Sequence, residues 1–403
     1  MNGRALADLL TYLGTLPLDP DLRRSLEEEA SAFLEWGAHA GREIAQRSAV
    51  LKGLRYLRPG PAAPVPAEPE VLRDLALVGG APRFHALLML VAYLLLEARR
   101  FDLSLLRYLE PLEDRLAGVA PAANRLAALA GAATMPARAR ARGLPPDLVE
   151  AARLRTRELA FACPSGIPFA DLPDLAYDLR LVSYDHGGFS FSLQAFTGPV
   201  RVLSPEGSPH PVVLPENGRE LDAEGYLWNP ACGSPPAWVA RVHCAGEALE
   251  ANTIVGPDGL CHPASIRLGP PLPRTLLARG DDALEMHVEA GASLDDQSLT
   301  QALAAATEHY RRHFPDFSPR AAFMVSWLLD PQLPALLGER SRIRHFRRHF
   351  RLYPCRYDPD YARACVLGGL SPARAPTSLQ KALLEREAQG GCLREGGGLI
   401  LLS

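Results

Sequence analysis

The chain has 403 residues, of which 47% are hydrophobic and 22% charged, and its formal net charge is −3. This length allows two domains with separate cores, and the composition is typical of an ordinary globular protein and not of a disordered one. The small net charge gives no overall electrostatic reason to bind nucleic acid or an anionic membrane surface. We therefore expect neither as a partner, and the sequence does not indicate an oligomeric state.

The cysteines and the apolar runs bear on location. The seven cysteines are scattered and never form a Cys-x-x-Cys pair, which is typical of reduced thiols in a cytoplasm. The first residues lack the layout of an export signal, and the longest apolar run, Ala86–Leu96, is too short to span a bilayer. Almost all basic residues are arginines, which suggests a GC-rich bacterial genome. We expect a cytoplasmic bacterial protein without a membrane span.

The first part of the chain has a helical pattern. Apolar residues recur at helical spacing over residues 4–57 and again from residue 71 to about 165, without a catalytic signature. Between these parts, the proline-rich segment 59–70 predicts an extended, semi-rigid linker. We predict an all-α N-terminal domain over residues 1–165 that contains this linker.

After residue 165 the pattern changes to that of strands. Two strand-like runs, 177–184 and 189–196, are separated by Asp-His-Gly-Gly, which is a hairpin signal, and a short strand follows at 200–203. Residues 204–236 are rich in proline and glycine and should form loops. These features predict a second domain, 166–403, built on a sheet.

Two His/Cys pairs in this domain raise the question of zinc. They are His243-Cys244 and Cys261-His262. Their spacing matches no usual set of zinc ligands, and adjacent residues of a strand face opposite ways. We expect ordinary thiols and no metal.

The segment 283–329 predicts a crossover unit with two parallel strands. In the first strand, 283–289, apolar residues alternate with Glu285, His287 and Glu289, so one face is core and the other is a row of titratable groups. A helix follows from a capping box at Ser293-x-x-Asp296, and residues 322–329 form a second, buried strand. His287 and Ser326 then lie on the two strands of one unit.

The end of this second strand predicts a junction where anions bind. Asp330 occupies the N-cap position and Pro331 the first position of a short helix, 332–337, so backbone N–H groups gather near Asp330 and Gln332. An ordinary strand-to-helix connection is the alternative.

A basic helix over residues 340–351 is the next candidate. Its apolar residues form a core face, and Arg344, Arg347 and Arg348 lie among the arginines of the outer face. These three could bind an anion, or they could be part of a solvated face.

The order of motifs in the last third of the chain resembles a known family. Ser-Trp-Leu-Leu-Asp-Pro-Gln-Leu (326–333) is followed by Ser341, Ile343 and Phe346, with Gly-Asp-Asp-Ala-Leu-Glu-Met-His-Val (280–288) upstream. This order resembles bacterial two-domain acyltransferases, in which a helical N-terminal domain precedes a domain like the GCN5-related N-acetyltransferases (GNAT). The chain departs from the family pattern at Arg342 and Arg347. The usual Arg/Gln-x-x-Gly-x-Gly/Ala pyrophosphate motif is also absent, and Arg394-Glu-Gly-Gly-Gly-Leu comes nearest to it.

The resemblance implies an α+β protein with a GNAT-like mixed-sheet domain. It implies acetyl-CoA or another acyl-CoA as co-substrate and a small-molecule amine as acceptor. Acyl transfer to an amine needs a base, which His287, Glu285 or Glu289 could supply, and we add Ser326 as a further catalytic candidate. Asp330, Gln332, Arg344, Arg347 and Arg348 are the candidates for binding the cofactor. The alternative is a catalytically inactive ligand-binding or scaffold protein on the same fold.

Overall fold

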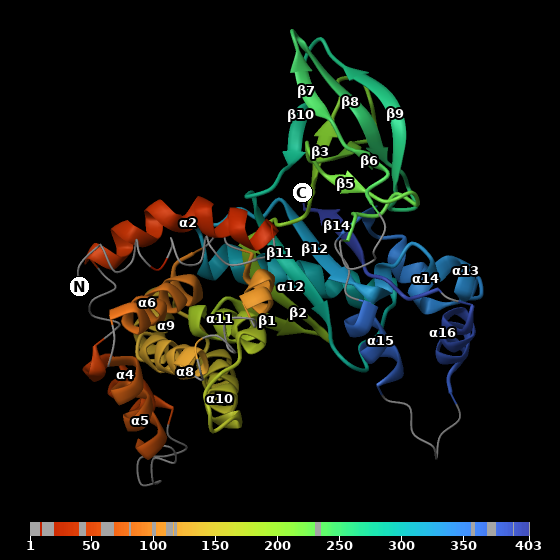
Figure 1. The fold of residues 1–403 in the computed structure, drawn as a ribbon. Coiled ribbons are helices and arrows are strands. Elements are labelled where there is room, and N and C mark those ends of the chain that lie inside the picture. The colour runs from red at the N-terminus through yellow and green to blue at the C-terminus, as the bar shows by residue number, and fades with distance from the viewer. Residues whose placement is uncertain are drawn as a thin grey trace. The chain divides into compact units, whose positions relative to one another are not determined.

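The structure, a computed structural model, describes most of the chain (Figure 1). The described residues are 9, 20–39, 46–57, 68–79, 82–98, 102–109, 116, 119–229, 235–355, 359–368, 376–389 and 391–402. Its contacts divide the chain into two compact units, residues 1–184 and 185–403. The fold class is α+β, as predicted.

The first unit is helical. Its helices are α2 (Pro20–His39), α4 (Arg47–Tyr56), α5 (Glu68–Gly79), α6 (Pro82–Leu96), α8 (Val119–Ala132), α9 (Met135–Arg142), α10 (Pro146–Ala162) and α11 (Leu172–Arg180), with 3-10 helices at Leu103–Leu109 and Phe169–Asp171. Every residue of the alanine-rich helix α8 is buried. Gly53 of α4 lies against it, where a Cβ atom would be 1.6 Å from the carbonyl oxygen of Leu129. The small residues thus let two helix backbones touch.

Two predictions for this unit need correction. Residues 177–180, predicted as the start of a strand, belong to α11, and strand β1 (Ser183–His186) begins only later. The buried residues Leu172, Leu175, Ala176 and Leu179 have helical spacing, and this periodicity outweighs the local strand propensity. Most of the predicted linker, 59–67, lies outside the described residues, and Glu68–Glu70 already belongs to α5. No helix in the described part of the chain is long and apolar enough to cross a membrane.

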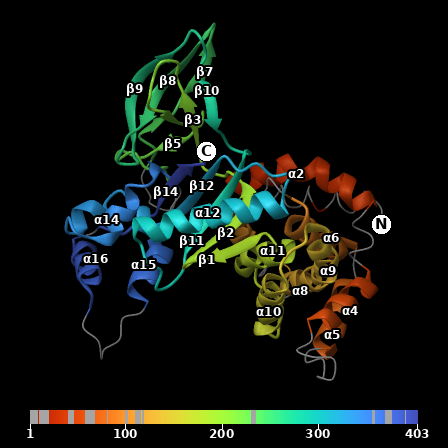
Figure 2. The same cartoon turned by 180° about the vertical axis from the view of Figure 1, so that it is seen from behind.

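The second unit is organised around a six-stranded mixed sheet in the order β1-β2-β11-β12-β14-β13. Its strands after β1 are β2 (Phe189–Ala195), β11 (Asp282–Val288), β12 (Ala321–Ser326), β13 (Arg351–Tyr353) and β14 (Gly396–Leu401), and its helices are α12 (Asp296–His313), α13 (Leu333–Leu336), α14 (Arg342–Arg347), α15 (Pro359–Leu367) and α16 (Ser378–Ala388). Strands β11 and β12 are parallel neighbours joined through α12, as predicted. Helix α12 runs across one face of the sheet (Figure 2), where the Tyr310 hydroxyl donates to the Phe191 carbonyl at 2.7 Å.

A set of smaller sheets, residues 196–281, is inserted between the paired strands β2 and β11. This β-insert contains β3 (Val200–Ser204), β4 (Val212–Pro215), β5 (Glu220–Leu221), β6 (Trp238–Val239), β7 (Val242–Ala245), β8 (Ala248–Val255), β9 (Cys261–Leu268) and β10 (Arg274–Leu277). Phe196 of the insert stacks edge-on against Phe323 of β12, and both belong to one buried cluster. Strands β4 and β5 lie within residues 204–236, so the expectation of loops there is wrong for these two segments.

The segment after β12 differs from the prediction in three places. β12 ends at Ser326, and Trp327 begins a 3-10 helix, Trp327–Leu329, in which it is only half-buried. The predicted helix 332–337 shortens to the single turn α13. The basic helix ends at Arg347, because the chain turns and Arg351 enters the edge strand β13.

Candidate functional site

The parallel strands β11 and β12 separate toward their carboxyl ends. Their pairing runs from Ala283↔Ala321 only to Glu285↔Phe323. Beyond that point β11 stays paired with β2 as far as Val288, and β12 stays paired with β14 as far as Ser326. The last residues of the two strands therefore border a break in the sheet, which we call the fork. The carboxyl ends of parallel strands are where α/β sheets usually bind ligands.

A row of polar side chains lies beside the fork. On β11, the His287 Nε2 atom is 3.7 Å from a Glu285 carboxylate oxygen, which accepts a 2.6 Å hydrogen bond from the Gln194 amide of β2. The Glu285 side chain is 15% exposed and that of His287 is 51% exposed, so the row leads from the buried amide out to an accessible imidazole. Opposite residues of paired strands share a face, which places Ser192 next to Glu285 and Ser190 next to His287.

The other two predicted catalytic residues lie at the ends of the fork strands. Glu289 follows β11, is exposed, and its backbone N–H bonds to the Gly188 carbonyl. Ser326 closes β12, and its hydroxyl accepts a 3.2 Å hydrogen bond from the Leu328 N–H, so it caps the 3-10 helix. Capping gives Ser326 a structural task that accounts for the hydroxyl at this position.

Asp330 lies in a buried polar network, which we call the Asp330 network. One carboxylate oxygen accepts from the Gln332 N–H at 2.8 Å, the other accepts from the Arg394 N–H at 2.7 Å, and the side chain is fully buried. The Tyr226 hydroxyl lies 3.4 Å from the first oxygen. Burial raises the pKa of Asp330. This carboxylate connects Tyr226 of the β-insert with the backbone at Gln332 and at Arg394.

Arg347 belongs to the same network. It is 5% exposed, and its guanidinium donates to the Asp330 carbonyl oxygen at 2.5 Å. Burial lowers the pKa of Arg347, and the nearby Asp330 carboxylate opposes that shift. Gln332 is half-buried, and both polar atoms of its side-chain amide are buried without a hydrogen-bond partner among the described residues. Two of the predicted cofactor ligands, Asp330 and Arg347, are thus occupied within the fold.

A groove of about 750 Å³, which we call the basic groove, is lined by four arginines of the basic segment: Arg344, Arg347, Arg348 and Arg351. One wall comes from residues 211–213 and 254–258 of the β-insert, and the other comes from Pro331, Pro334 and the segment 344–352. Arg344 is half-buried and donates to the Leu337 carbonyl at 3.3 Å, whereas Arg348 and Arg351 are exposed. The lining contains four arginines and one acidic residue, Asp258.

The N-terminus of α12, which follows β11, carries carboxylates. Asp295 is its N-cap and accepts from the Ser298 N–H at 2.8 Å. The hydrogen bond from the Ser293 hydroxyl is the first cause that lowers the pKa of Asp295, to about 2, so this group is charged at neutral pH. The next residue, Asp296, pairs with His349 at 2.8 Å. A helix N-terminus that usually attracts anions is here occupied by the protein's own acids.

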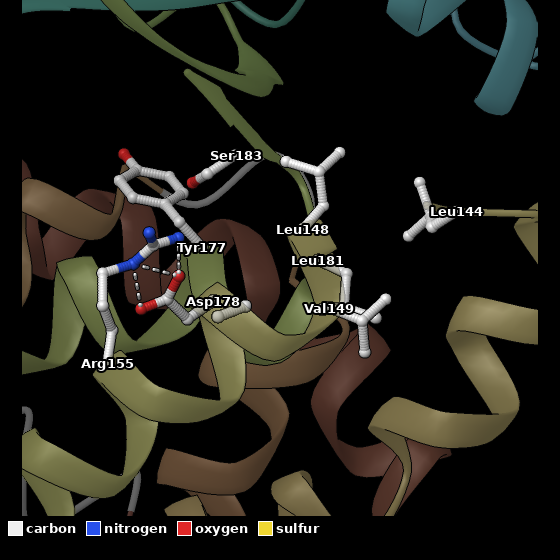
Figure 3. Close-up of a pocket in the computed structure, with 9 residues that line it drawn as sticks. Leu144, Leu148, Val149, Arg155, Tyr177, Asp178, Leu181 and Ser183 are labelled. Carbon is white, nitrogen blue, oxygen red and sulfur yellow. Dashed lines mark hydrogen bonds and ion pairs between the residues drawn. The ribbon is translucent and has the colours of Figure 1, made fainter. Parts of the chain in front are cut away.

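The helical unit contains a small cavity between α10 and α11 (Figure 3). The sticks show Arg155 and Asp178 joined by hydrogen bonds of 2.7–3.1 Å at one side of it. Its volume is about 10 Å³, which is room for about one water molecule. This cavity cannot hold a substrate.

The positions of the His, Cys, Asp and Glu side chains also bear on metal binding. Within the described ranges, no group of three or more His, Cys, Asp or Glu side chains could hold a metal ion. The pairs 243–244 and 261–262 lie on β7 and β9, where His243 pairs with Glu250 and His262 with Asp258.

Several site residues were not identified from the sequence. They are Gln194, Tyr226 and Arg394, whose partners are 64 to 104 residues away in the sequence. Val212 and Val213 of the basic groove come from residues 204–236, which were expected to be loops. Alternation over β2 offered a signal for Gln194, because its neighbours Leu193 and Ala195 are apolar.

Part of the second unit is similar to a known family. Residues 223–400 match the family described as the GNAT-like C-terminal domain. No match is found among curated proteins. A solved acyltransferase in complex with decanoyl-CoA is 18% identical, with a TM-score of 0.44, over 95% of this chain and 98% of that one. An acyltransferase in complex with decanoyl-CoA and teicoplanin is 17% identical, with a TM-score of 0.45, over 100% of both chains.

Proposed function

From the GNAT-like C-terminal domain of residues 223–400, we propose that the protein is an acyltransferase that moves an acyl group from acyl-CoA to the amine of a small molecule. The observation that carries the proposal is the fork between β11 and β12 with the polar row of Glu285 and His287 beside it. The sequence resemblance described above supplies the donor, acyl-CoA.

The fork suits the donor's pantetheine arm. Strand edges that lack a ladder partner can pair with an extended amide chain, as in β-strand addition. An arm that enters between Met286 and Met324 would bring its thioester to the carboxyl ends of the strands, where His287 is exposed. The half-exposed position of this histidine leaves room for an acceptor on its open side.

His287 is the proposed base. The amine nitrogen attacks the thioester carbonyl carbon, the carbon–sulfur bond breaks, and the amide and CoA thiol are the products. His287 takes the proton that the amine loses and a proton returns to the leaving thiolate. Glu285, held by Gln194, stabilises the imidazolium that forms and orients the ring, and it is thus a positioning residue. Glu289 is the next candidate base.

A second candidate function, a ligand-binding or scaffold protein without turnover, is favoured by the N-terminus of α12. Asp295 and Asp296 would repel a pyrophosphate at this position. The acyltransferase therefore requires another place for the phosphates of CoA. A cytoplasmic location remains part of the proposal, and the six cysteines of the described part are free thiols, in keeping with it.

The test is thiol release from a panel of acyl-CoAs with a panel of small amines. His287→Ala should lower kcat by about 10²- to 10⁴-fold and leave the Kd for acyl-CoA unchanged, because loss of a general base affects the chemical step. His243→Ala is the matched control, since His243 is also an exposed strand histidine that pairs with a glutamate, Glu250, at 3.6 Å. This variant should keep full activity.

Two outcomes would contradict the proposal. Full activity of His287→Ala would mean that His287 is not the base, and Glu289 or a water molecule would become the candidate. Absence of thiol release from every donor and acceptor pair, together with measurable binding of acyl-CoA, would favour the silent ligand-binding protein.

A further inference from the structure

The basic groove combines a cationic wall with an apolar wall. Arg344, Arg348 and Arg351 come from α14, the turn after it and the edge strand β13. Facing them, the β-insert contributes Val212, Val213 and Ile254. A volume of about 750 Å³ is within the range of sites for small molecules and cofactors. Such a site fits an organic molecule that carries a strong anion.

The local charges favour an anion as the occupant. The only carboxylate of the lining, Asp258, is already bonded to His262 at 3.0 Å and to the Leu260 N–H at 3.1 Å. Arg347 is committed to the Asp330 carbonyl, and its burial holds the base of the groove in place. Arg348 and Arg351 are exposed, and a guanidinium nitrogen of Arg348 lies 3.4 Å from the His345 Nδ1 atom.

The groove is also built to a fixed shape. Gly259 has a φ of +90°, and a Cβ atom there would lie 2.7 Å from the Cβ of Leu352. The turn 256–259 of the β-insert is therefore pressed against β13, next to Arg351. This contact holds the turn of the β-insert against β13 beside the groove, where Asp258 and Leu352 belong to the lining.

We propose that the basic groove binds the phosphate group of an organic phosphate, with Arg348 and Arg351 as its principal ligands and Arg344 as a third. Guanidinium groups bind phosphate in a bidentate manner, and the apolar wall takes the organic part. Two sources share this chemistry: the nucleotide portion of CoA, or an acceptor that itself carries a phosphate. The choice of CoA rests on the proposed function, whereas phosphate binding does not.

The experiment uses the full-length chain and calorimetric titration with two probes at low and high salt. Adenosine 3′,5′-bisphosphate represents the nucleotide portion of CoA, and phenyl phosphate represents a phosphorylated acceptor. The variant is the double charge reversal Arg348→Glu with Arg351→Glu. Its control is Arg311→Glu with Arg312→Glu, which makes the same change of net charge at exposed positions in the last turn of α12.

We expect the groove variant to lose at least about tenfold in affinity for a probe, with a weaker salt dependence, while the control does not. Loss with the bisphosphate assigns the groove to CoA. Loss with phenyl phosphate alone assigns it to the acceptor. Binding of neither probe to the wild type, or equal losses in both variants, would overturn the proposal. Thermal unfolding of each variant shows that the fold is intact.

The outcome is separable from that of the acyltransferase proposal. An enzyme whose turnover depends on His287 but whose groove binds no phosphate would overturn only the groove. A groove that binds phosphate in a protein without turnover would keep the groove and overturn the enzyme.

Discussion

The Asp330 network and the polar row of β11 lie in the same unit, but their titratable groups differ in burial and in hydrogen bonding. Asp330 is fully buried, and each of its carboxylate oxygens has a backbone N–H partner. His287 is half-exposed, and its Nε2 atom lies 3.7 Å from the Glu285 carboxylate. The network commits its groups to one arrangement, whereas the row leaves an imidazole accessible. Motif position alone did not distinguish the two, and burial does.

The largest effect is expected where the network is cut. Asp330→Ala removes the acceptor of the Gln332 and Arg394 N–H groups and the nearest negative charge to the buried Arg347. Leaving such groups unpaired should lower the free energy of unfolding by about 3–5 kcal/mol, measured by urea denaturation. Glu308→Ala, which breaks an exposed pair with Arg311, is the control and should change it by about 0.5 kcal/mol or less. Similar values for the two variants would mean that the network does not stabilise the fold.

Much of the difference between these two regions could not be read from the sequence. The β11, α12 and β12 crossover was predicted correctly, because alternation and helical periodicity are local patterns. In the sequence, Asp330 resembled an N-cap at a ligand site. Its partner Arg394 is 64 residues away, so no local pattern could reveal that the Asp330 side chain is buried. The capping role of Asp295 was also missed, since Ser293 matched the capping box better. Non-local contacts decided each of these cases.

His309, a second buried titratable group, should make the stability of the fold depend on pH. Burial, followed by the charge of His313, lowers the pKa of His309 to about 4, from about 6.5 in the unfolded chain. The unfolded state therefore binds the proton first, and stability should be lost as pH falls from about 6.5 to about 4, by up to about 3 kcal/mol. When the free energy of unfolding is measured by urea denaturation across this pH range, it should depend less steeply on pH for His309→Phe than for the wild type. An unchanged dependence on pH would mean that His309 is not the group responsible for it.

Trp327 lies between the two extremes. It is half-buried and packs against the cluster of Leu333, Val366 and Leu383. Full burial of a tryptophan is worth about 3–5 kcal/mol on truncation to alanine, so we expect about 2 kcal/mol for Trp327→Ala. The matched measurement is Leu329→Ala, in the same 3-10 helix but fully buried, which should cost more per atom removed. A larger cost per atom removed for Trp327→Ala than for Leu329→Ala would mean that Trp327 contributes to stability as a core residue does.

The smallest effect on stability is expected at the polar row. His287→Ala opens no core cavity, so the free energy of unfolding should change by about 0.5 kcal/mol or less, by the same denaturation assay. A loss of more than 2 kcal/mol would make His287 a structural residue, and its effect on turnover would then no longer identify a base.

The position of β14 in the sheet has a consequence for how the chain folds during synthesis. Strand β13 has its ladder with β14 alone, and β14 lies between β13 and β12 although it follows both in the sequence. Arg351 can take its final place only after residues 396–401 have left the ribosome, some seconds later at about 5–20 residues per second. Until then β12 has an open edge that contains Phe323 and Met324. A nascent chain paused in this interval should bind chaperones through that edge, and codon choice between β13 and β14 should affect the yield of folded protein.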